Sequence, residues 1–157
     1  MKKRRKRTSK DVPAKGRLAD LADRLWSLAV KDDWAHRCAI CGRRENLNSH
    51  HLIPRQHQAT RFDLRNGICL CKTCHQFCPN YSPHQHGKGF DLWLTNHHPS
   101  FASWVEANAY PKFTGTTNAD YYCEQIQRLR EYVEQDDFTR IVGVRFAAYL
   151  EAGGNDG

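Results

Sequence analysis

Two Cys-x-x-Cys pairs constrain the fold of this chain more than any other feature. The first pair is Cys38 and Cys41, and the second is Cys71 and Cys74. Such a pair places two thiolates on one short turn, and two turns that face each other form the tetrahedral S₄ site that Zn²⁺ prefers. The sequence therefore predicts a structural zinc held by four cysteines. The 29 residues between the pairs exceed an ordinary zinc-ribbon loop, which indicates that the loop carries something more.

The cysteine count favours a metal site over disulfides. The chain has seven cysteines, an odd number, and its basic start is not followed by the apolar segment of a secretion signal. Reduced thiols are therefore expected. A thioredoxin-like redox pair would need a βαβ context, which the pattern does not show. Cys69 and Cys78 flank the second pair, and either could replace a ligand; the alternative is that they and Cys123 are small buried apolar side chains.

Positive charge is concentrated at the N-terminus. The net charge is +7, while outside residues 1–10 basic and acidic residues balance at 17 each. A like-charged run repels itself, stays extended and favours a polyanion as its partner. We expect residues 1–15 to form a disordered arm that binds nucleic acid; the alternative is a solubilising or nuclear-targeting tail. The expected nucleic-acid contacts in the arm are Lys2, Lys3, Arg4, Arg5, Lys6 and Arg7.

The rest of the chain is polarised. Residues 31–90 hold nine basic and four acidic residues, and residues 120–157 hold four basic and eight acidic. We expect the acidic C-terminal helices to complete the core; the alternatives are that they support dimerisation or shield an active site. No apolar run reaches the roughly 18–20 residues that span a bilayer. We therefore expect a cytoplasmic protein (or a nuclear one in a eukaryotic host) without a membrane partner.

Hydrophobic periodicity and turn residues predict an α+β fold. The expected domain covers residues 16–157, with a ββα core at about 34–80 and a helical part at about 88–152. Trp93, Phe101 and Trp104 are expected in the core. A capping box of Thr117 and Asp120 would open the helix that runs to about residue 135. The expected helices are 16–32, a short one from 72, 88–97, 100–109, 117–135 and 138–151, and the expected strands are 47–53 and 67–71.

The histidines indicate a second metal site. All nine lie between His36 and His98. Neighbouring side chains of a strand point to opposite faces, so His50 and His51 would serve different roles. On a helix, Cys71 and Cys74 share a face, and His75 is rotated away from it by about 100° toward the hairpin. One helical turn could then contribute to a structural ion through its cysteine face and to a catalytic ion through its histidine face.

These residues resemble the HNH, or ββα-metal, nuclease family over about residues 34–80. The matching motifs are Cys38-Ala-Ile-Cys41, His50-His51-Leu-Ile-Pro54 and Asp63-Leu-Arg-Asn66, followed by Cys71-Lys-Thr-Cys74-His75. The resemblance implies hydrolysis of DNA phosphodiester bonds, as a nick or a double-strand break, through one divalent ion (Mg²⁺, Mn²⁺, Ni²⁺ or Zn²⁺). A looser resemblance to phage NinG-type recombination proteins rests on Trp26, Arg61-Phe-Asp and the Trp-containing helices that follow. It suggests a phage or mobile-element setting and, as an alternative function, a recombination-junction nuclease of the NinG type.

The resemblance also implies a role for each site residue. His51 would be the general base, Asn66 would fix its loop, and His50 and His75 would hold the ion. Some family members carry a further histidine four residues after the one that matches His75, where this chain has Pro79. His84 is the expected third ligand instead, while His86, His97 and His98 are expected to be surface or core residues.

Three arginines, Arg55, Arg61 and Arg65, lie in the loop between His51 and Asn66, where guanidinium groups could clamp phosphates. The alternative is that they are solvated loop charges.

Two other kinds of protein fit part of the pattern. A non-catalytic zinc module that binds nucleic acid would explain the cysteines and the arm, and a protein-interaction zinc module would explain the cysteines alone. Neither explains why His51, Asn66 and His75 occur together.

Overall fold

The computed structural model describes residues 11–110 and 112–153. The basic run at residues 1–10 lies outside them, so the disordered arm stays a prediction. Contacts divide the chain into two compact units, one of residues 26–115 and one of residues 1–25 with 116–157. The boundary falls within helix α1 (Lys15–Asp33). The single domain expected over 16–157 stays a prediction.

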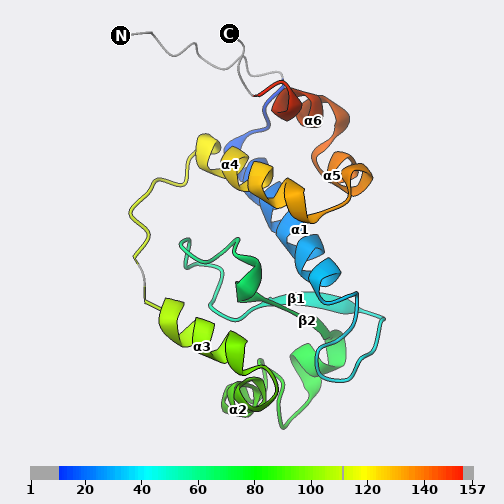
Figure 1. Cartoon of the computed structure of the whole chain (residues 1–157), viewed down its shortest axis with the longest axis vertical. Coiled ribbons are helices and arrows are strands. Elements are labelled where there is room, and N and C mark those ends of the chain that lie inside the picture. The colour runs from blue at the N-terminus through cyan, green and yellow to red at the C-terminus, as the bar shows by residue number, and fades with distance from the viewer. Residues whose placement is uncertain (1–10, 111, 154–157) are drawn as a thin grey trace. The chain divides into compact units, whose positions relative to one another are not determined.

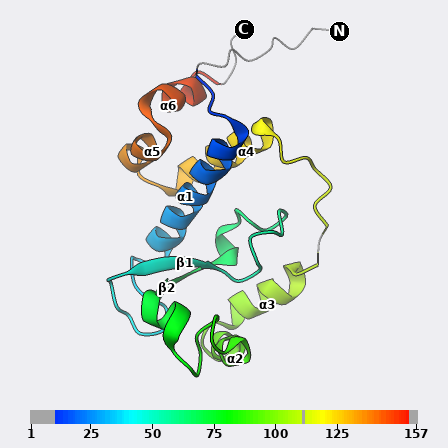
Figure 2. The same cartoon turned by 180° about the vertical axis from the view of Figure 1, so that it is seen from behind.

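The unit of residues 26–115 is built on a two-stranded antiparallel sheet (Figures 1 and 2). Strand β1 (Leu47–His51) pairs with β2 (Gly67–Cys71), from Leu47 opposite Cys71 to His51 opposite Gly67. The connecting loop ends in the 3₁₀ turn η1 (Leu64–Asn66). A single π-helical turn, η2 (Thr73–Phe77), follows β2, and α2 (Gly87–His97) and α3 (Pro99–Asn108) complete the unit. The α+β class with a ββα module is confirmed.

Strand β2 is buried at every position because helices pack on it. Gly67 lies so close to α1 that a Cβ there would stand 2.2 Å from Val30 Cγ2. Ile68 and Leu70 form a core with Phe90 and Leu94 of α2. The expected core residues Trp93, Phe101 and Trp104 are only half-buried, with Trp93 and Phe101 packed at the edge of this core.

The other unit contains the N-terminal part of α1 with α4 (Ala119–Leu129), the 3₁₀ turn η3 (Arg130–Tyr132), α5 (Gln135–Val142) and α6 (Val144–Glu151). Two sequence-based expectations are wrong here. Asn118, not Thr117, caps α4, because its side chain accepts a hydrogen bond from the Tyr121 amide. The helix expected over 138–151 is two helices, because Gly143 adopts a φ of 88° between them.

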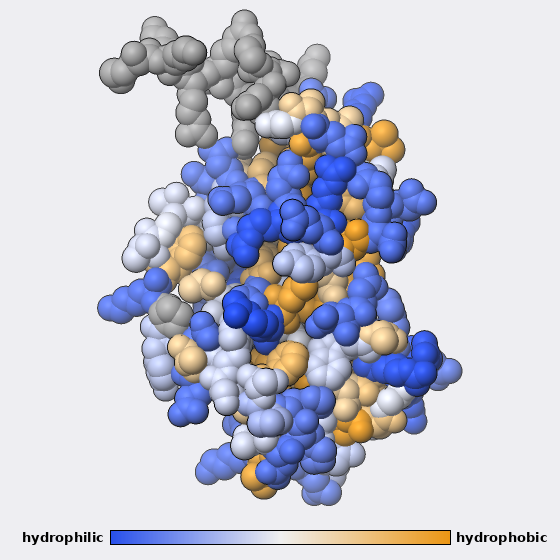
Figure 3. Space-filling model, in the orientation of Figure 1, coloured by the Kyte–Doolittle hydropathy of each residue, from blue (hydrophilic) through white to orange (hydrophobic). Residues whose placement is uncertain are grey.

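Hydrophilic side chains cover most of the face shown in Figure 3. The large hydrophobic side chains that are exposed among the described residues are Phe77, Leu92, Tyr110, Phe113, Tyr132 and Val144. Within residues 11–110 and 112–153, no helix is both long enough and apolar enough to cross a membrane.

Candidate metal centres and active site

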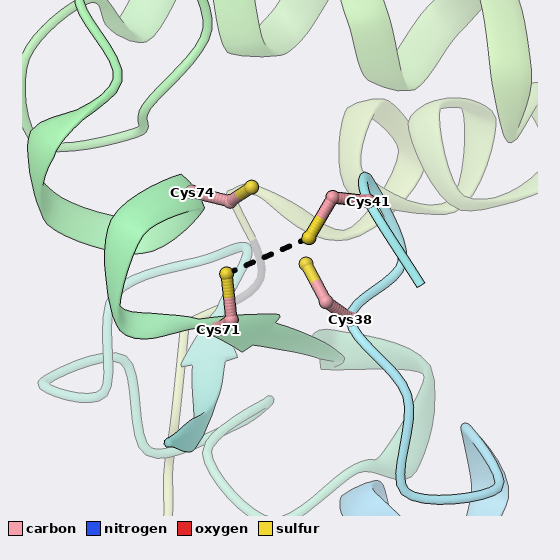
Figure 4. A group of neighbouring side chains, drawn as sticks. All are labelled: Cys38, Cys41, Cys71 and Cys74. Carbon is pink, nitrogen blue, oxygen red and sulfur yellow. Dashed lines mark hydrogen bonds between the residues drawn. The ribbon is translucent and has the colours of Figure 1, made fainter. Parts of the chain in front are cut away.

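Four cysteine sulfurs from three segments converge at one end of the hairpin (Figure 4). Cys38 and Cys41 come from the loop after α1, Cys71 ends β2, and Cys74 lies on η2. Their Sγ atoms all lie within 4.8 Å of one another, and those of Cys41 and Cys71 are 3.7 Å apart. Because Zn–S bonds are about 2.3 Å long, tetrahedral sulfurs stand about 3.8 Å apart. The four cysteines are thus positioned to bind a structural metal such as zinc, and neither Cys69 nor Cys78 belongs to the group.

Backbone hydrogen bonds shape the first Cys-x-x-Cys turn. The Gly42 amide donates to the Cys38 carbonyl at 2.8 Å, which requires the positive φ of 74° that glycine adopts easily. Burial acts to raise the pKa of the Cys38 thiol, but hydrogen bonds from the backbone of Cys41, Cys71 and Ile40 together lower it. Burial raises the pKa of Cys41 and Cys74. Metal binding here must therefore release protons from thiols.

Three histidines form a second group on the same hairpin. His50 comes from β1, His75 from η2 and His84 from the loop before α2. Nε2 of His75 lies 3.1 Å from His50 Nδ1 and 3.1 Å from His84 Nε2. All three ligand atoms lie within 4.8 Å of one another. Imidazole nitrogens bind Zn²⁺ at about 2.0–2.1 Å, so tetrahedral ligands stand about 3.4 Å apart, and this group fits a metal ion.

The environment keeps the central histidines neutral. Burial, reinforced by His75, His84 and His51, lowers the pKa of His50 to about 3. Burial and the neighbouring His84 also lower the pKa of His75. A neutral imidazole keeps a nitrogen lone pair, which is the form that binds transition metals. His75 directly follows Cys74, so one turn of η2 contributes to both groups.

A buried serine holds the third histidine in place. Ser82 is 0% exposed, and its Oγ donates a hydrogen bond to the His75 carbonyl at 2.6 Å. The same oxygen accepts from the amides of His84 at 3.2 Å and Gln85 at 3.3 Å. Sequence reasoning missed this residue, although a serine two positions before an expected ligand is a signal for a side-chain turn. His86 caps α2 by accepting from the Gly89 amide at 2.9 Å.

His51 faces a different environment from His50. Its ring stacks on the indole of Trp26, with centroids 3.7 Å apart and planes 10° from parallel. Its Nε2 lies 2.9 Å from the carbonyl oxygen of Arg61. Because a carbonyl only accepts, Nε2 of the neutral ring carries the proton and Nδ1 carries the lone pair. The two adjacent histidines thus lie in different surroundings, as a strand requires, and Trp26 is a neighbour that the sequence did not reveal.

Asn66 ties down both ends of the loop that follows His51. It is fully buried, and its Oδ1 accepts from the Ile53 amide at 2.6 Å. Its Nδ2 donates to the carbonyls of Ile53 at 2.9 Å and Thr60 at 3.1 Å. Only a side chain that both donates and accepts can make this set of bonds, which explains the need for an amide.

The three loop arginines differ in their surroundings. Arg55 is exposed. Arg61 is half-buried, and its guanidinium lies over the Phe62 ring at 5.2 Å. Arg65 is exposed but paired with both carboxylate oxygens of Asp63, at 3.0 and 2.7 Å, and lies 5.3 Å over the Trp104 ring. Lys2, Lys3, Arg4, Arg5, Lys6 and Arg7 lie outside the described residues.

Residues 38–77 match the family model of the HNH endonucleases. The match begins at the first cysteine of the metal group and ends after His75, so it includes the whole hairpin but not His84. Comparisons with curated proteins and with solved structures gave no match. The resemblance to HNH nucleases is confirmed for this segment, whereas the looser resemblance to NinG-type proteins stays a prediction.

Proposed function

We propose that this chain, whose residues 38–77 form an HNH endonuclease module, is a metal-dependent enzyme that hydrolyses phosphodiester bonds in DNA. One observation carries the proposal. Three imidazoles converge on one point, while the ring of the adjacent residue, His51, is held by a carbonyl on the other face of the strand. A purely structural zinc module would need neither feature.

The two groups of ligands have separate tasks in this proposal. Cys38, Cys41, Cys71 and Cys74 hold a structural Zn²⁺, and His50, His75 and His84 hold a catalytic divalent ion (Mg²⁺, Mn²⁺, Ni²⁺ or Zn²⁺). When bound, the catalytic ion supplies positive charge that stabilises the negative charge developing on the phosphate and the leaving oxygen.

His51 acts as the general base. The hydrogen bond to the Arg61 carbonyl keeps the proton on Nε2, so Nδ1 can accept a proton from the attacking water. A neutral imidazole is able to take a proton from water near pH 7. Asn66 contributes by fixing the loop that supplies this carbonyl.

Arginine side chains contact the phosphates. The loop that begins directly after His51 carries Arg55, Arg61 and Arg65. Phosphate contacts from these arginines would place the DNA backbone beside His51, the proposed general base. The basic run with Lys2, Lys3, Arg4, Arg5, Lys6 and Arg7 adds contacts that are independent of DNA sequence.

Incubation of supercoiled plasmid with the protein and each of the four ions tests the proposal. The wild type should nick or linearise the plasmid. The His51→Ala variant should cleave about 10²- to 10⁴-fold more slowly, the range ascribed to general bases, and still shift DNA in a gel. His57→Ala is the matched control because His57 is an exposed histidine of the same loop, and it should cleave like the wild type.

Two results would contradict the proposal. Undiminished cleavage by His51→Ala would remove the base from the mechanism. A wild-type protein that binds DNA but does not cleave it with any of the four ions would be a non-catalytic zinc module for nucleic-acid binding.

A further inference from the structure

We propose that Trp26 is a positioning residue that fixes the plane of the His51 ring, an inference that rests on the proposed function of His51. The two rings stack in parallel, with centroids 3.7 Å apart and planes 10° from parallel. Trp26 is only 2% exposed, so its indole has little room to move. It lies on α1, outside the segment that matches the HNH family model.

Both stacked rings are anchored to the same loop by their N–H groups. Trp26 Nε1 donates to the Asp63 carbonyl at 3.0 Å, and His51 Nε2 donates to the Arg61 carbonyl at 2.9 Å. The two accepting carbonyls are only two residues apart. Rotation of either ring out of its plane would therefore break a hydrogen bond as well as the stack.

The backbone of β2 and that of α1 both hold the indole of Trp26 against the hairpin. Gly67 pairs with His51 in the sheet, and a Cβ at Gly67 would lie 3.0 Å from Cζ2 of Trp26. The next residue of α1, Ser27, is bonded to β1: Ser49 Oγ donates to the Ser27 carbonyl at 2.7 Å. The helix is thus fixed to the strand one residue away from Trp26 and two residues away from His51.

This arrangement sets the direction in which the base can act. The Nδ1 lone pair of an imidazole lies in the plane of the ring, so an indole that fixes this plane fixes the line along which a proton is accepted. Misplacement of a catalytic group by about 1 Å can cost about 10²-fold in rate. Trp26 should therefore affect turnover rather than DNA binding.

Steady-state kinetics on three variants tests the proposal. Trp26→Leu removes the aromatic face and should lower kcat about 10- to 100-fold, while KM, DNA affinity and the metal content of the cysteine group stay at wild-type values. Trp26→Phe keeps an aromatic face and should restore most of kcat. Val30→Ala is the control, because Val30 also packs on Gly67 but does not stack on His51; it should lower the melting temperature and leave kcat unchanged.

An NMR measurement on the wild type, with Zn²⁺ bound at the cysteine group, gives a readout that does not depend on cleavage or on the kinetics of a Trp26 variant. The indole should shift the ring C–H signals of His51 upfield, and their absence from the spectrum of His51→Gln identifies them. Signals at the positions of unstacked imidazoles would overturn the inference, as would a folded Trp26→Leu protein with wild-type kcat. A wild type that cleaves no DNA would instead overturn the proposed function, and the catalytic role of the stack with it.

Discussion

The hydroxyl of Ser82 links two histidines of the candidate catalytic metal centre. It bonds to the carbonyl of His75 and to the amide of His84, and it is fully buried. Without this oxygen the His84 amide would lose its bond to Ser82, and only backbone hydrogen bonds such as that from the His86 amide to the Ser82 carbonyl would still hold the loop. Groups that orient metal ligands typically contribute 10- to 100-fold in metal affinity.

We therefore expect Ser82→Ala to weaken metal binding at the histidine group about 10-fold or more. Titration with Co²⁺, followed by its visible absorption after the cysteine group has been filled with Zn²⁺, measures this affinity. Ser103→Ala is the control, because Ser103 is an exposed serine on α3. Equal Co²⁺ affinity in Ser82→Ala and wild type would show that His84 needs no such support.

The sequence indicated which candidate ligands lie together better than it indicated the residues that support them. The cysteine pairs and the order of His50, His51, Asn66 and His75 have informative spacing, because each lies on a short element of fixed geometry. The stack of Trp26 on His51 joins residues from α1 and β1. Periodicity predicts the helix that carries Trp26 but not which side chain Trp26 contacts.

Among the elements, the hairpin shows how a side chain can end a strand. Strand β2 occupies the predicted residues, but β1 stops at His51 rather than at Ile53. The Ile53 amide bonds to the Asn66 side chain instead of continuing the ladder. Residues 52 and 53 have the composition of a strand, so only the tertiary contact reveals the end.

The same limit applies to the C-terminal helices. An apolar pattern of helical period continues across Gly143, and one helix is the simplest interpretation of it. The positive φ of Gly143 turns the chain instead. Thr117 and Asn118 can both cap a helix, so sequence alone does not decide which of the two does so.

Close contact between the hairpin and α1 gives an element-scale prediction. A Cβ at Gly67 would stand 2.2 Å from Val30 Cγ2 and 3.0 Å from Trp26 Cζ2. Gly67→Ala should therefore destabilise the protein by about 1–3 kcal/mol, the usual cost of overpacking a core. Urea unfolding followed by circular dichroism measures the change.

Gly16→Ala is the matched control for this substitution. Gly16 lies at the start of α1, and a Cβ there would meet no atom within 4 Å. Alanine favours helix over glycine by up to about 1 kcal/mol, so this variant should be as stable as the wild type or more so. Equal stability of Gly67→Ala and wild type would mean that α1 can shift away from the hairpin at no cost.

At the scale of the whole molecule, the cysteine group joins segments that lie far apart in the sequence. It connects the loop after α1, the end of β2 and the start of η2. Structural zinc contributes roughly 10 kcal/mol or more to the folding of small metal domains. Cys71→Ser should therefore lose the bound metal and the fixed tertiary structure of residues 26–115, as measured by metal analysis and near-UV circular dichroism.

Cys78→Ala controls for the loss of a thiol near the same turn. Cys78 is not a member of the cysteine group, so this variant should retain one metal ion there and a native spectrum. A metal-free Cys71→Ser protein with a native spectrum and full cleavage activity would contradict a structural role for the ion.

Charge is distributed unevenly along the chain. The basic and acidic residues outside residues 1–10 balance, so the N-terminal run carries the net positive charge of the protein. Each phosphate that a basic side chain neutralises contributes about 0.9 to the slope of log affinity against log salt. Replacement of Lys2, Lys3, Arg4, Arg5, Lys6 and Arg7 by glutamine should therefore weaken DNA binding and flatten this slope by as much as about 5. Fluorescence anisotropy with a labelled duplex at several salt concentrations measures both quantities.

Replacement of Arg128 and Arg140, basic residues of the acidic C-terminal region, by glutamine is the control and should leave the slope unchanged. A wild-type slope after these substitutions would contradict a role of the N-terminal run in DNA binding, and the phosphate contacts would have to come from basic residues elsewhere in the chain.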